Sequence, residues 1–129
     1  MKIVRTIPVL LFIAFLGLSP SVSAASEVVE AFAILAAERQ EGDGSNLIYL
    51  VGVGEALVIL NAKLDVEAGR TFYCPPENLA LNSFNYADIA LKTFESKPSM
   101  YDNPVLRRRP RAVLAEALID GLIATFPCD

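Results

Sequence analysis

Residues Asn46–Leu64 read NLIYLVGVGEALVILNAKL and decide the fold of this chain. Between Leu47 and Leu60 the only charged side chain is that of Glu55. A helix that is apolar on every side is normally packed on every side by other elements. Two strands joined by a hairpin at Gly52-Val53-Gly54 are the main alternative, but polar and apolar residues do not alternate and the run exceeds ordinary strand length. The stretch therefore predicts a central helix, buried all round.

The N-terminal region has the composition of a secretory signal peptide. Two basic residues precede the apolar stretch Ile7–Leu18, and Val22-Ser23-Ala24 has the small-x-small pattern of a cleavage site. We therefore predict that residues 1–24 are a signal peptide, with cleavage after Ala25 as the alternative to cleavage after Ala24. An uncleaved anchor helix is the less favoured interpretation. Export by this route predicts a periplasmic protein whose residues 25–129 form a single domain.

The exported chain is acidic, which narrows its partners. All 15 acidic residues follow residue 24, together with 9 of the 11 basic residues, so the net charge of residues 25–129 is −6. Such a surface is a poor match for nucleic acid or for anionic lipid. The central apolar run is also shorter than the roughly 20 residues that a bilayer span needs. We therefore predict no nucleic-acid partner and no stable membrane span after signal cleavage.

The chain holds two cysteines, Cys74 and Cys128. In an oxidising compartment, two cysteines in a small domain most simply form a disulfide. The spacing excludes a CxxC-type redox pair, and a metal pair lacks further ligands. Such a bridge closes a long loop, which stabilises the fold by on the order of 4 kcal/mol in the chain-entropy model.

Four helices are expected in residues 25–129. The first starts after the N-cap Ser26 and ends near Gln40, and the central helix is capped by Ser45 or Asn46 and reaches at most Gly69. The third helix runs from Phe84 to about Ser96, with Asn82 or Ser83 as its N-cap, and the last runs from Pro110 to about Phe126. Their expected buried faces are Val28, Val29, Phe32, Leu35 and Ala36 in the first, Phe84, Ala87, Leu91 and Phe94 in the third, and Val113, Leu114, Ala117, Leu118 and Leu122 in the last. The sequence thus predicts an all-α bundle of four to five helices stapled by one disulfide.

The chain contains no histidine. This excludes Ser-His-Asp and Cys-His hydrolases and the common zinc sites. Carboxylate pairs remain as acid–base candidates, namely Glu27 with Glu30, Glu41 with Asp43 and Glu116 with Asp120, but their placement is more typical of solvated surfaces. We therefore predict no catalytic residue, no metal site and no cofactor, with a carboxylate-based enzyme as the least favoured alternative.

A cluster of arginines, Arg107-Arg108-Arg109-Pro110-Arg111, interrupts this acidic chain. Its first three arginines end a polar loop, residues 99–109, in which Tyr101 is expected to be exposed. Tyrosine and arginine most often anchor protein interfaces. We therefore predict that Tyr101, Asp102, Arg107 and Arg108 bind a partner. The alternative is that Tyr101 folds back onto the bundle and that the arginines are only solvated.

Several short motifs together resemble a known family. They are Tyr49-x-x-Gly52, Phe72-Tyr73-Cys74-Pro75-Pro76, Thr93-Phe94-Glu95-Ser96-Lys97-Pro98, Ala115-x-Ala117-Leu118 and Phe126-Pro127-Cys128. The set is similar to that of the Rap/Tai immunity proteins and spans about residues 47–128. Many relatives also carry a cysteine where this chain has Asn46, and residues 102–109 are longer than the usual connection in that family.

The resemblance implies a function without catalysis. Rap/Tai proteins are helical, periplasmic and usually dimeric, and they protect a bacterium from peptidoglycan amidases delivered by type VI secretion. We therefore expect a protein that binds such an amidase effector and blocks its cleft, and that forms a homodimer. A periplasmic structural or accessory module of the same fold, with no toxin partner, is the alternative.

Overall fold

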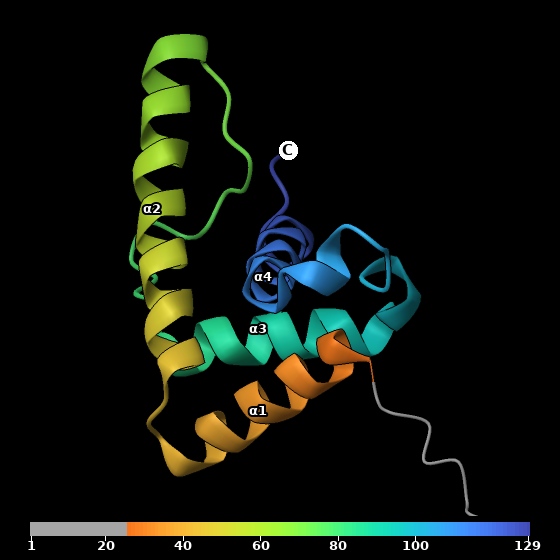
Figure 1. Ribbon diagram of the computed structural model, residues 1–129. Coiled ribbons are helices and arrows are strands. Elements are labelled where there is room, and N and C mark those ends of the chain that lie inside the picture. Colours follow the sequence, from red (N-terminus) through yellow and green to blue (C-terminus); the bar gives the residue numbers. More distant parts are fainter. Residues whose placement is uncertain (1–25) are drawn as a thin grey trace, which may run out of the picture.

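The computed structural model describes residues 26–129, so the predicted signal peptide and its cleavage site lie outside the described residues. This part of the chain folds into the helices α1 (Glu27–Glu41), α2 (Ser45–Ala68), α3 (Ser83–Ser96) and α4 (Pro110–Thr125), with two short 3-10 turns, η1 (Pro98–Met100) and η2 (Leu106–Arg108), between the last two (Figure 1). No strand occurs in residues 26–129. The predicted small all-α bundle is therefore confirmed.

Two of the predicted helix caps are confirmed. The Ser26 hydroxyl accepts a hydrogen bond of 3.3 Å from the backbone N–H of Val29 at the start of α1. At the start of α3, Asn82 and Asn85 form a reciprocal capping box, in which each side chain accepts from the backbone N–H of the other at 3.0 Å. Both helices therefore begin where the sequence predicts, within one residue.

The predicted cap of α2 is wrong. The N-cap residue is Gly44, and neither Ser45 nor Asn46 caps the helix with its side chain. The carboxylate of Glu38, from the end of α1, instead accepts hydrogen bonds from the backbone N–H groups of Asn46 at 2.8 Å and Leu47 at 3.2 Å. A negative charge at this point also suits the positive end of the helix dipole. The turn between α1 and α2 is thus closed by a side chain from the preceding helix.

The core lies where α1, α3, α4 and the first half of α2 meet. All five residues predicted for the buried face of α4 are buried, as are Val28, Phe32, Leu35 and Ala87 from the other predicted faces. Phe32 of α1 stacks on Phe94 of α3, with ring centroids 3.8 Å apart. Two assignments are wrong: Val29 is 46% exposed, and Phe84 is 37% exposed and lies under the guanidinium of Arg39. The predicted helical spacing is therefore confirmed for α4, whereas the predicted faces of α1 and α3 each include one residue that the structure exposes.

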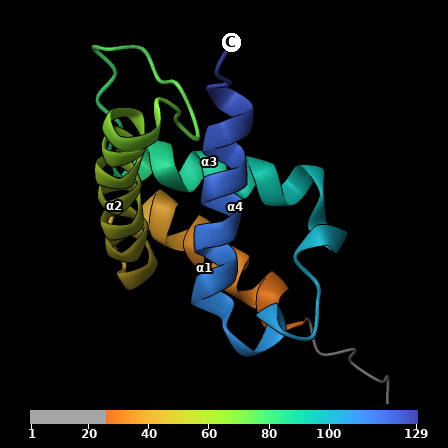
Figure 2. The same ribbon diagram turned by 90° about the horizontal axis from the view of Figure 1, so that it is seen from above.

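The central stretch is helical, as predicted, but it is not buried all round. Only Asn46, Leu47, Leu50 and Gly54 of α2 are buried, whereas Ile59 is 60% exposed and Val66 is 86% exposed. Figures 1 and 2 both show α2 at the edge of the molecule, and Figure 1 shows its C-terminal end projecting beyond the other helices. The shorter helices α1, α3 and α4 cover one side of α2, so its other side has no partner within residues 26–129.

The length argument against a membrane span is also wrong for this helix. The structure extends α2 to Ala68, 24 residues in all, because Gly69 ends it in the left-handed conformation with φ 60°. By length and composition alone, α2 could cross a membrane. Of the 18 residues of its most apolar segment, 22% are buried within the bundle.

The predicted disulfide between Cys74 and Cys128 is confirmed. It joins the loop that follows α2 to the chain just beyond α4, and the backbone N–H of Cys74 donates to the carbonyl of Phe126 at 2.8 Å. Asn61 of α2 holds the same loop, since its side chain accepts from the N–H of Phe72 and donates to the carbonyl of Tyr73, both at 2.7 Å. The loop therefore bridges the projecting half of α2 and the end of α4.

Candidate partner-binding surface

The predicted partner-binding residues lie in the connection between α3 and α4, residues 97–109, which runs along the outside of the bundle in Figure 2. Tyr101 is the first of them, and its predicted exposure is wrong: the side chain is 1% exposed. Its ring lies 6.5 Å from that of Phe32 and 6.2 Å from that of Phe94. Its hydroxyl donates to a carboxylate oxygen of Asp120 at 2.8 Å. Tyr101 therefore folds back onto the bundle and anchors the connection.

Tyr101 is buried because the core offers an apolar contact for its ring and a hydrogen-bond acceptor for its hydroxyl. The two phenylalanine rings take the apolar body of Tyr101, and Asp120 takes its hydroxyl. Burial raises the pKa of the Tyr101 hydroxyl, and the hydrogen bond to Asp120 and the charges of Asp120 and Glu116 raise it further. The prediction that Glu116 and Asp120 both lie on a solvated surface is therefore wrong for Asp120, which is partly buried and accepts this bond.

Asp102 and Arg107, two further predicted residues, contact each other. The guanidinium of Arg107 donates to both oxygens of the Asp102 carboxylate, at 2.7 and 2.9 Å. This bond from Arg107 lowers the pKa of Asp102, and the same bond raises the pKa of Arg107. Both side chains remain about half exposed. The pair therefore braces the connection across five residues and stays accessible at the surface.

Asn103 is a structural residue of this connection that the sequence analysis missed. Its side-chain oxygen accepts from the backbone N–H groups of Val105 at 3.1 Å and Leu106 at 2.9 Å. Asparagine favours such local turns, and Asn-Pro is a turn signal that could have identified it. The turn at Asn103 fixes how the chain enters η2.

Asp102, Arg107 and Arg108 of the predicted set face solvent, and so do two apolar side chains that the prediction did not include. Val105 is 75% exposed and Met100 is 56% exposed. Methionine and arginine are enriched at protein interfaces, and Arg107 is already paired with Asp102. Of the four predicted residues, Arg108 is therefore the one best placed to reach a partner, together with Val105 and Met100.

A groove of about 730 Å³ lies beside the connection, between α3 and α4. Most of its lining surface is apolar, and Asp88, Lys92, Lys97 and Asp120 add charges of both signs. Such a mixed surface suits another protein better than one small ligand. The groove is continuous with Met100 and so widens the surface that the connection offers.

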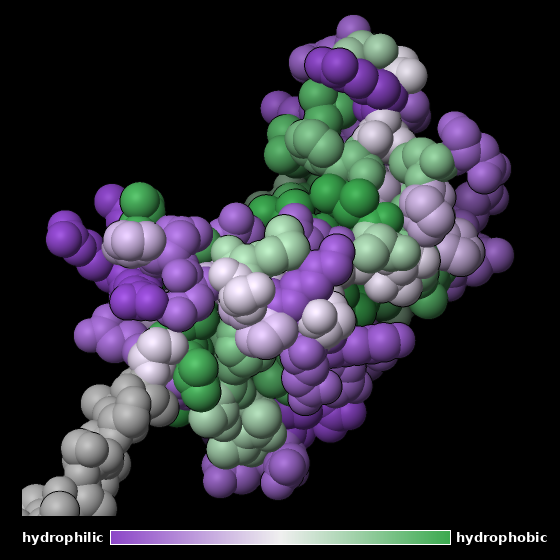
Figure 3. Space-filling view, turned by 90° about the vertical axis from the view of Figure 1, so that its right-hand side faces the viewer, coloured by the Kyte–Doolittle hydropathy of each residue, from purple (hydrophilic) through white to green (hydrophobic). Residues whose placement is uncertain are grey.

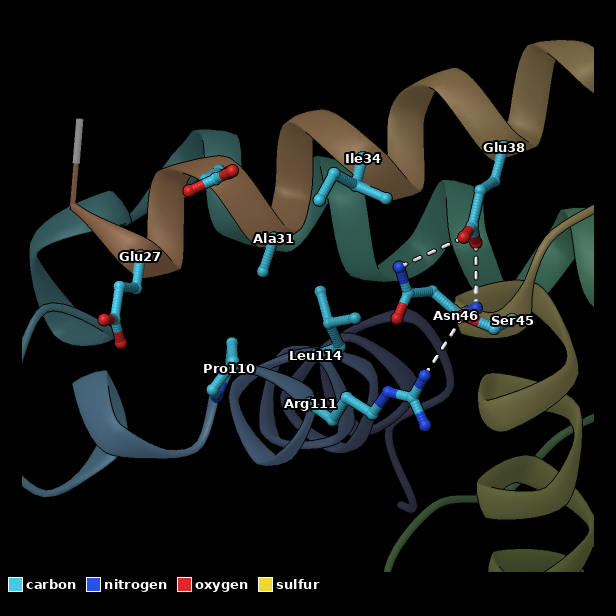
Figure 4. A pocket seen from close by; sticks show the side chains of 10 residues that line it. Glu27, Ala31, Ile34, Glu38, Ser45, Asn46, Pro110, Arg111 and Leu114 are labelled. Carbon is cyan, nitrogen blue, oxygen red and sulfur yellow. Dashed lines mark hydrogen bonds between the residues drawn. The ribbon is translucent and has the colours of Figure 1, made fainter. Parts of the chain in front are cut away.

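A second hollow, of about 470 Å³, lies where α1 meets the starts of α2 and α4 (Figure 4). Glu27, of the first predicted carboxylate pair, lines it, and Figure 4 shows Glu38 and Arg111 reaching the start of α2 from opposite sides. Arg111 donates to the Ser45 hydroxyl at 3.1 Å, while Glu38 binds the backbone and side chain of Asn46. These polar groups bond to one another, so the hollow serves as a junction that holds three helices together.

A third hollow, of about 210 Å³, is lined only by Leu57, Leu60, Phe72, Tyr73, Ile119, Leu122 and Ile123. It lies between the projecting half of α2, the loop that follows it and α4. Figure 3 shows hydrophobic surface gathered at the notch between the projecting end and the body of the molecule. Leu60, Phe72 and Ile123 are each at least 40% exposed here. The predicted site did not include this apolar hollow.

No match was found in a comparison with protein-family models, curated proteins and solved structures. The resemblance to Rap/Tai immunity proteins therefore rests on the sequence motifs alone. Within residues 26–129, no group of three or more histidine, cysteine, aspartate or glutamate side chains could hold a metal ion. The expected absence of a cofactor and of catalytic residues stays a prediction.

Proposed function

We propose that this protein is an exported inhibitor that binds a peptidoglycan amidase effector delivered by type VI secretion and blocks its cleft. One observation supports this proposal above the others: side-chain contacts hold the connection between α3 and α4 at three points. Tyr101 anchors it in the core, Asn103 fixes its turn, and Asp102 and Arg107 brace it from outside. A loop that is already ordered loses little conformational freedom on binding, which is what a tight inhibitor requires.

The proposal assigns separate roles to the residues of the connection. Tyr101 positions the loop and does not touch the partner, because its side chain is buried. Val105 and Arg108 make the contact: Val105 enters an apolar part of the amidase cleft, and Arg108 meets acidic groups at its rim. Asp102 and Arg107 stabilise the connection between the anchor Tyr101 and the contact residue Arg108. They make no contact with the partner, since their charges already neutralise each other.

The test begins with a search for a gene beside that of this protein that encodes an amidase-like effector, and uses the effector so found. Inhibition of peptidoglycan cleavage and binding would be measured for wild type, Val105→Asp and Arg108→Glu. Each variant should weaken binding by about 2 kcal/mol or more, roughly 30-fold, if these side chains anchor the interface. Leu79→Asp is the matched control, because Leu79 is also a part-exposed apolar residue but lies in the loop between α2 and α3. It should bind like wild type.

Two results would contradict the proposal. One is full inhibition by both variants, with helical circular dichroism unchanged, which would move the interface away from the connection. The other is that no amidase is encoded nearby and that the protein inhibits none. The second result would favour the alternative, a periplasmic structural or accessory module with no toxin partner.

A further inference from the structure

The disulfide lies at the surface of the molecule and not in its core. Cys74 and Cys128 are both exposed, the first in the loop after α2 and the second beyond the end of α4. Figure 1 shows this loop running between the projecting end of α2 and the C-terminal end of the chain. Exposed disulfides are the ones that thiols open most readily. A reductant can therefore reach both sulfurs without any unfolding of the bundle.

The hydroxyl of Thr71 contacts both sulfurs of the bridge. Its oxygen lies 3.1 Å from Sγ of Cys74 and 3.1 Å from Sγ of Cys128. Neither sulfur of a disulfide carries a hydrogen, so the hydroxyl is the donor. A neutral sulfur is a weak acceptor, whereas a thiolate is a strong one because it is charged. Thr71 is therefore placed to stabilise the thiolate that forms when the bridge is opened.

The loop that carries Cys74 has polar contacts with both α2 and the end of α4. On the α2 side, the Asn61 side chain forms two hydrogen bonds of 2.7 Å with the backbone of Phe72 and Tyr73. On the α4 side, a backbone hydrogen bond of 2.8 Å from Cys74 to Phe126 accompanies the bridge. Opening the bridge therefore removes the covalent tie to α4 and leaves both side-chain contacts with α2 in place.

The apolar hollow of about 210 Å³ lies between the two parts of the chain that the bridge joins. Leu60 of α2 and Phe72 of the loop line it from one side, and Leu122 and Ile123 of α4 line it from the other. Figure 3 shows hydrophobic surface gathered at this notch. Apolar contact has no preferred direction, so these walls can shift apart in small steps once no covalent bond holds them.

We propose that the bridge between Cys74 and Cys128 is a thiol–disulfide exchange site, at which a dithiol reductant of the CxxC class opens the bridge and frees the projecting half of α2 from α4. The chain is the substrate of this exchange and not its catalyst, in agreement with the wide spacing of its two cysteines. The inference does not rest on the inhibitor function, because no amidase takes part in it.

The exchange balances in two steps. A thiolate of the reductant attacks one Sγ, the S–S bond breaks, and its electron pair stays on the other Sγ, which accepts the hydrogen bond from Thr71. The second thiolate of the reductant then attacks the sulfur of the first one in the mixed disulfide and releases the remaining cysteine. Both cysteines take up a proton from water. Two electrons thus pass to the chain, and the dithiol becomes a disulfide.

The first test measures how fast reduced thioredoxin, a protein of the CxxC class, reduces the folded, exported protein near neutral pH. Free thiols are alkylated and counted by mass spectrometry. Thr71→Val should slow the reduction by about tenfold, because the thiolate loses a charge-assisted hydrogen bond. Thr71→Ser keeps a hydroxyl and should react at a rate close to that of wild type. Thr125→Val is the matched control, because in residues 26–129 the Thr125 hydroxyl does not bond to either sulfur.

Two results of this test would overturn the proposal. One is a wild-type bridge that thioredoxin leaves intact while the protein is folded. The other is a Thr71→Val variant that is reduced as fast as wild type.

The second test asks whether reduction needs unfolding. The rate of reduction by dithiothreitol is measured in increasing urea, below the unfolding transition that circular dichroism defines. It should stay nearly constant, because both cysteines are already exposed in the folded chain. A rate that rises in step with the unfolded fraction would show that the bridge is protected by the fold, and the proposal would be wrong.

The third test asks whether reduction opens the hollow. The fluorescence of 8-anilinonaphthalene-1-sulfonate, which increases on apolar surface, should rise by about twofold or more on reduction while circular dichroism stays helical. Ile123→Asp should abolish this rise, because it places a charge in the hollow. Val66→Asp is the matched control, because it adds the same charge at an exposed residue of α2 outside the hollow, and the rise should persist. No rise in the wild type, or an equal rise in Ile123→Asp, would overturn the proposed release.

Discussion

Gly52 and Gly54 are separated by one residue of α2 and lie in opposite environments. A methyl group added at Gly54 would overlap the ring of Tyr86, whereas one added at Gly52 would meet nothing within 4 Å. Gly54 thus lets α3 approach α2 closely, while Gly52 leaves open space on the exposed side of α2. The same residue type therefore serves intramolecular packing on one face of the helix and an open surface on the other.

This difference shows what overall hydropathy cannot tell. α2 is apolar around most of its circumference, yet the bundle buries only one of its sides. The buried side of α2 packs against the other helices, whereas its exposed side, with Ile48, Ile59 and Val66, contributes little packing energy to the bundle. Substitutions of matched size on the two faces should therefore differ sharply in their effect on the stability of the monomer.

The largest expected difference is between Leu50→Ala and Ile59→Ala. Leu50 is fully buried, so its truncation leaves a cavity and should lower the free energy of unfolding by about 2–5 kcal/mol. Ile59 is 60% exposed, so its truncation should change the free energy of unfolding by less than about 0.5 kcal/mol. Urea denaturation followed by circular dichroism, at the lowest workable protein concentration, measures both. Equal losses would show that the exposed side of α2 around Ile59 is packed within the folded chain.

Next in size is the loss of the disulfide, which joins the projecting half of α2 to the body through the following loop. Cys74→Ser with Cys128→Ser should lower the free energy of unfolding by about 2–4 kcal/mol, because the reduced chain has more freedom when unfolded. Hydrogen exchange should locate the effect in residues 57–74, since Asn61 holds this loop to α2. If the amides of the buried residues Leu47 and Leu50 lost protection from exchange before those of residues 57–74, this location would be wrong.

The smallest effects come from the two glycines themselves. Gly54→Ala should destabilise by about 1–3 kcal/mol, because the added methyl group must displace the buried ring of Tyr86. Gly52→Ala should stabilise the monomer by about 0.5–1 kcal/mol, because alanine is the better helix former and the space is open. Thermal unfolding of the two variants side by side measures the opposite signs. If both variants were less stable than wild type, Gly52 would also have to be packed against a neighbouring group.

The parts of the fold that depend on local sequence could be predicted. Helical spacing fixed the buried face of α4, the short polar side chains of Ser26 and Asn82 fixed two helix starts, and the two cysteines fixed the bridge. Each of these signals acts over a few residues or needs no geometry at all. The fold class followed from them.

The parts that depend on distant contacts could not be predicted. Glu38 caps α2 from eight residues away, and Tyr101 is buried because Asp120 lies opposite its hydroxyl in the folded bundle. The exposed side of α2 has no local signal either, because apolar spacing is the same for a core helix and for one that packs against another chain. That the connection between α3 and α4 binds a partner stays a prediction, but Tyr101, predicted as an exposed contact residue, is buried and anchors the connection.

The bridge between Cys74 and Cys128 also divides the chain mechanically. It closes a covalent ring that contains α3 and α4, whereas α1 and α2 lie outside it. A force on the N-terminal end can draw out α1 and α2, gaining about 3.3–3.6 Å for each extended residue, but it cannot lengthen the ring. Any machine that threads this protein through a narrow pore would have to pass two strands abreast or first reduce the bridge.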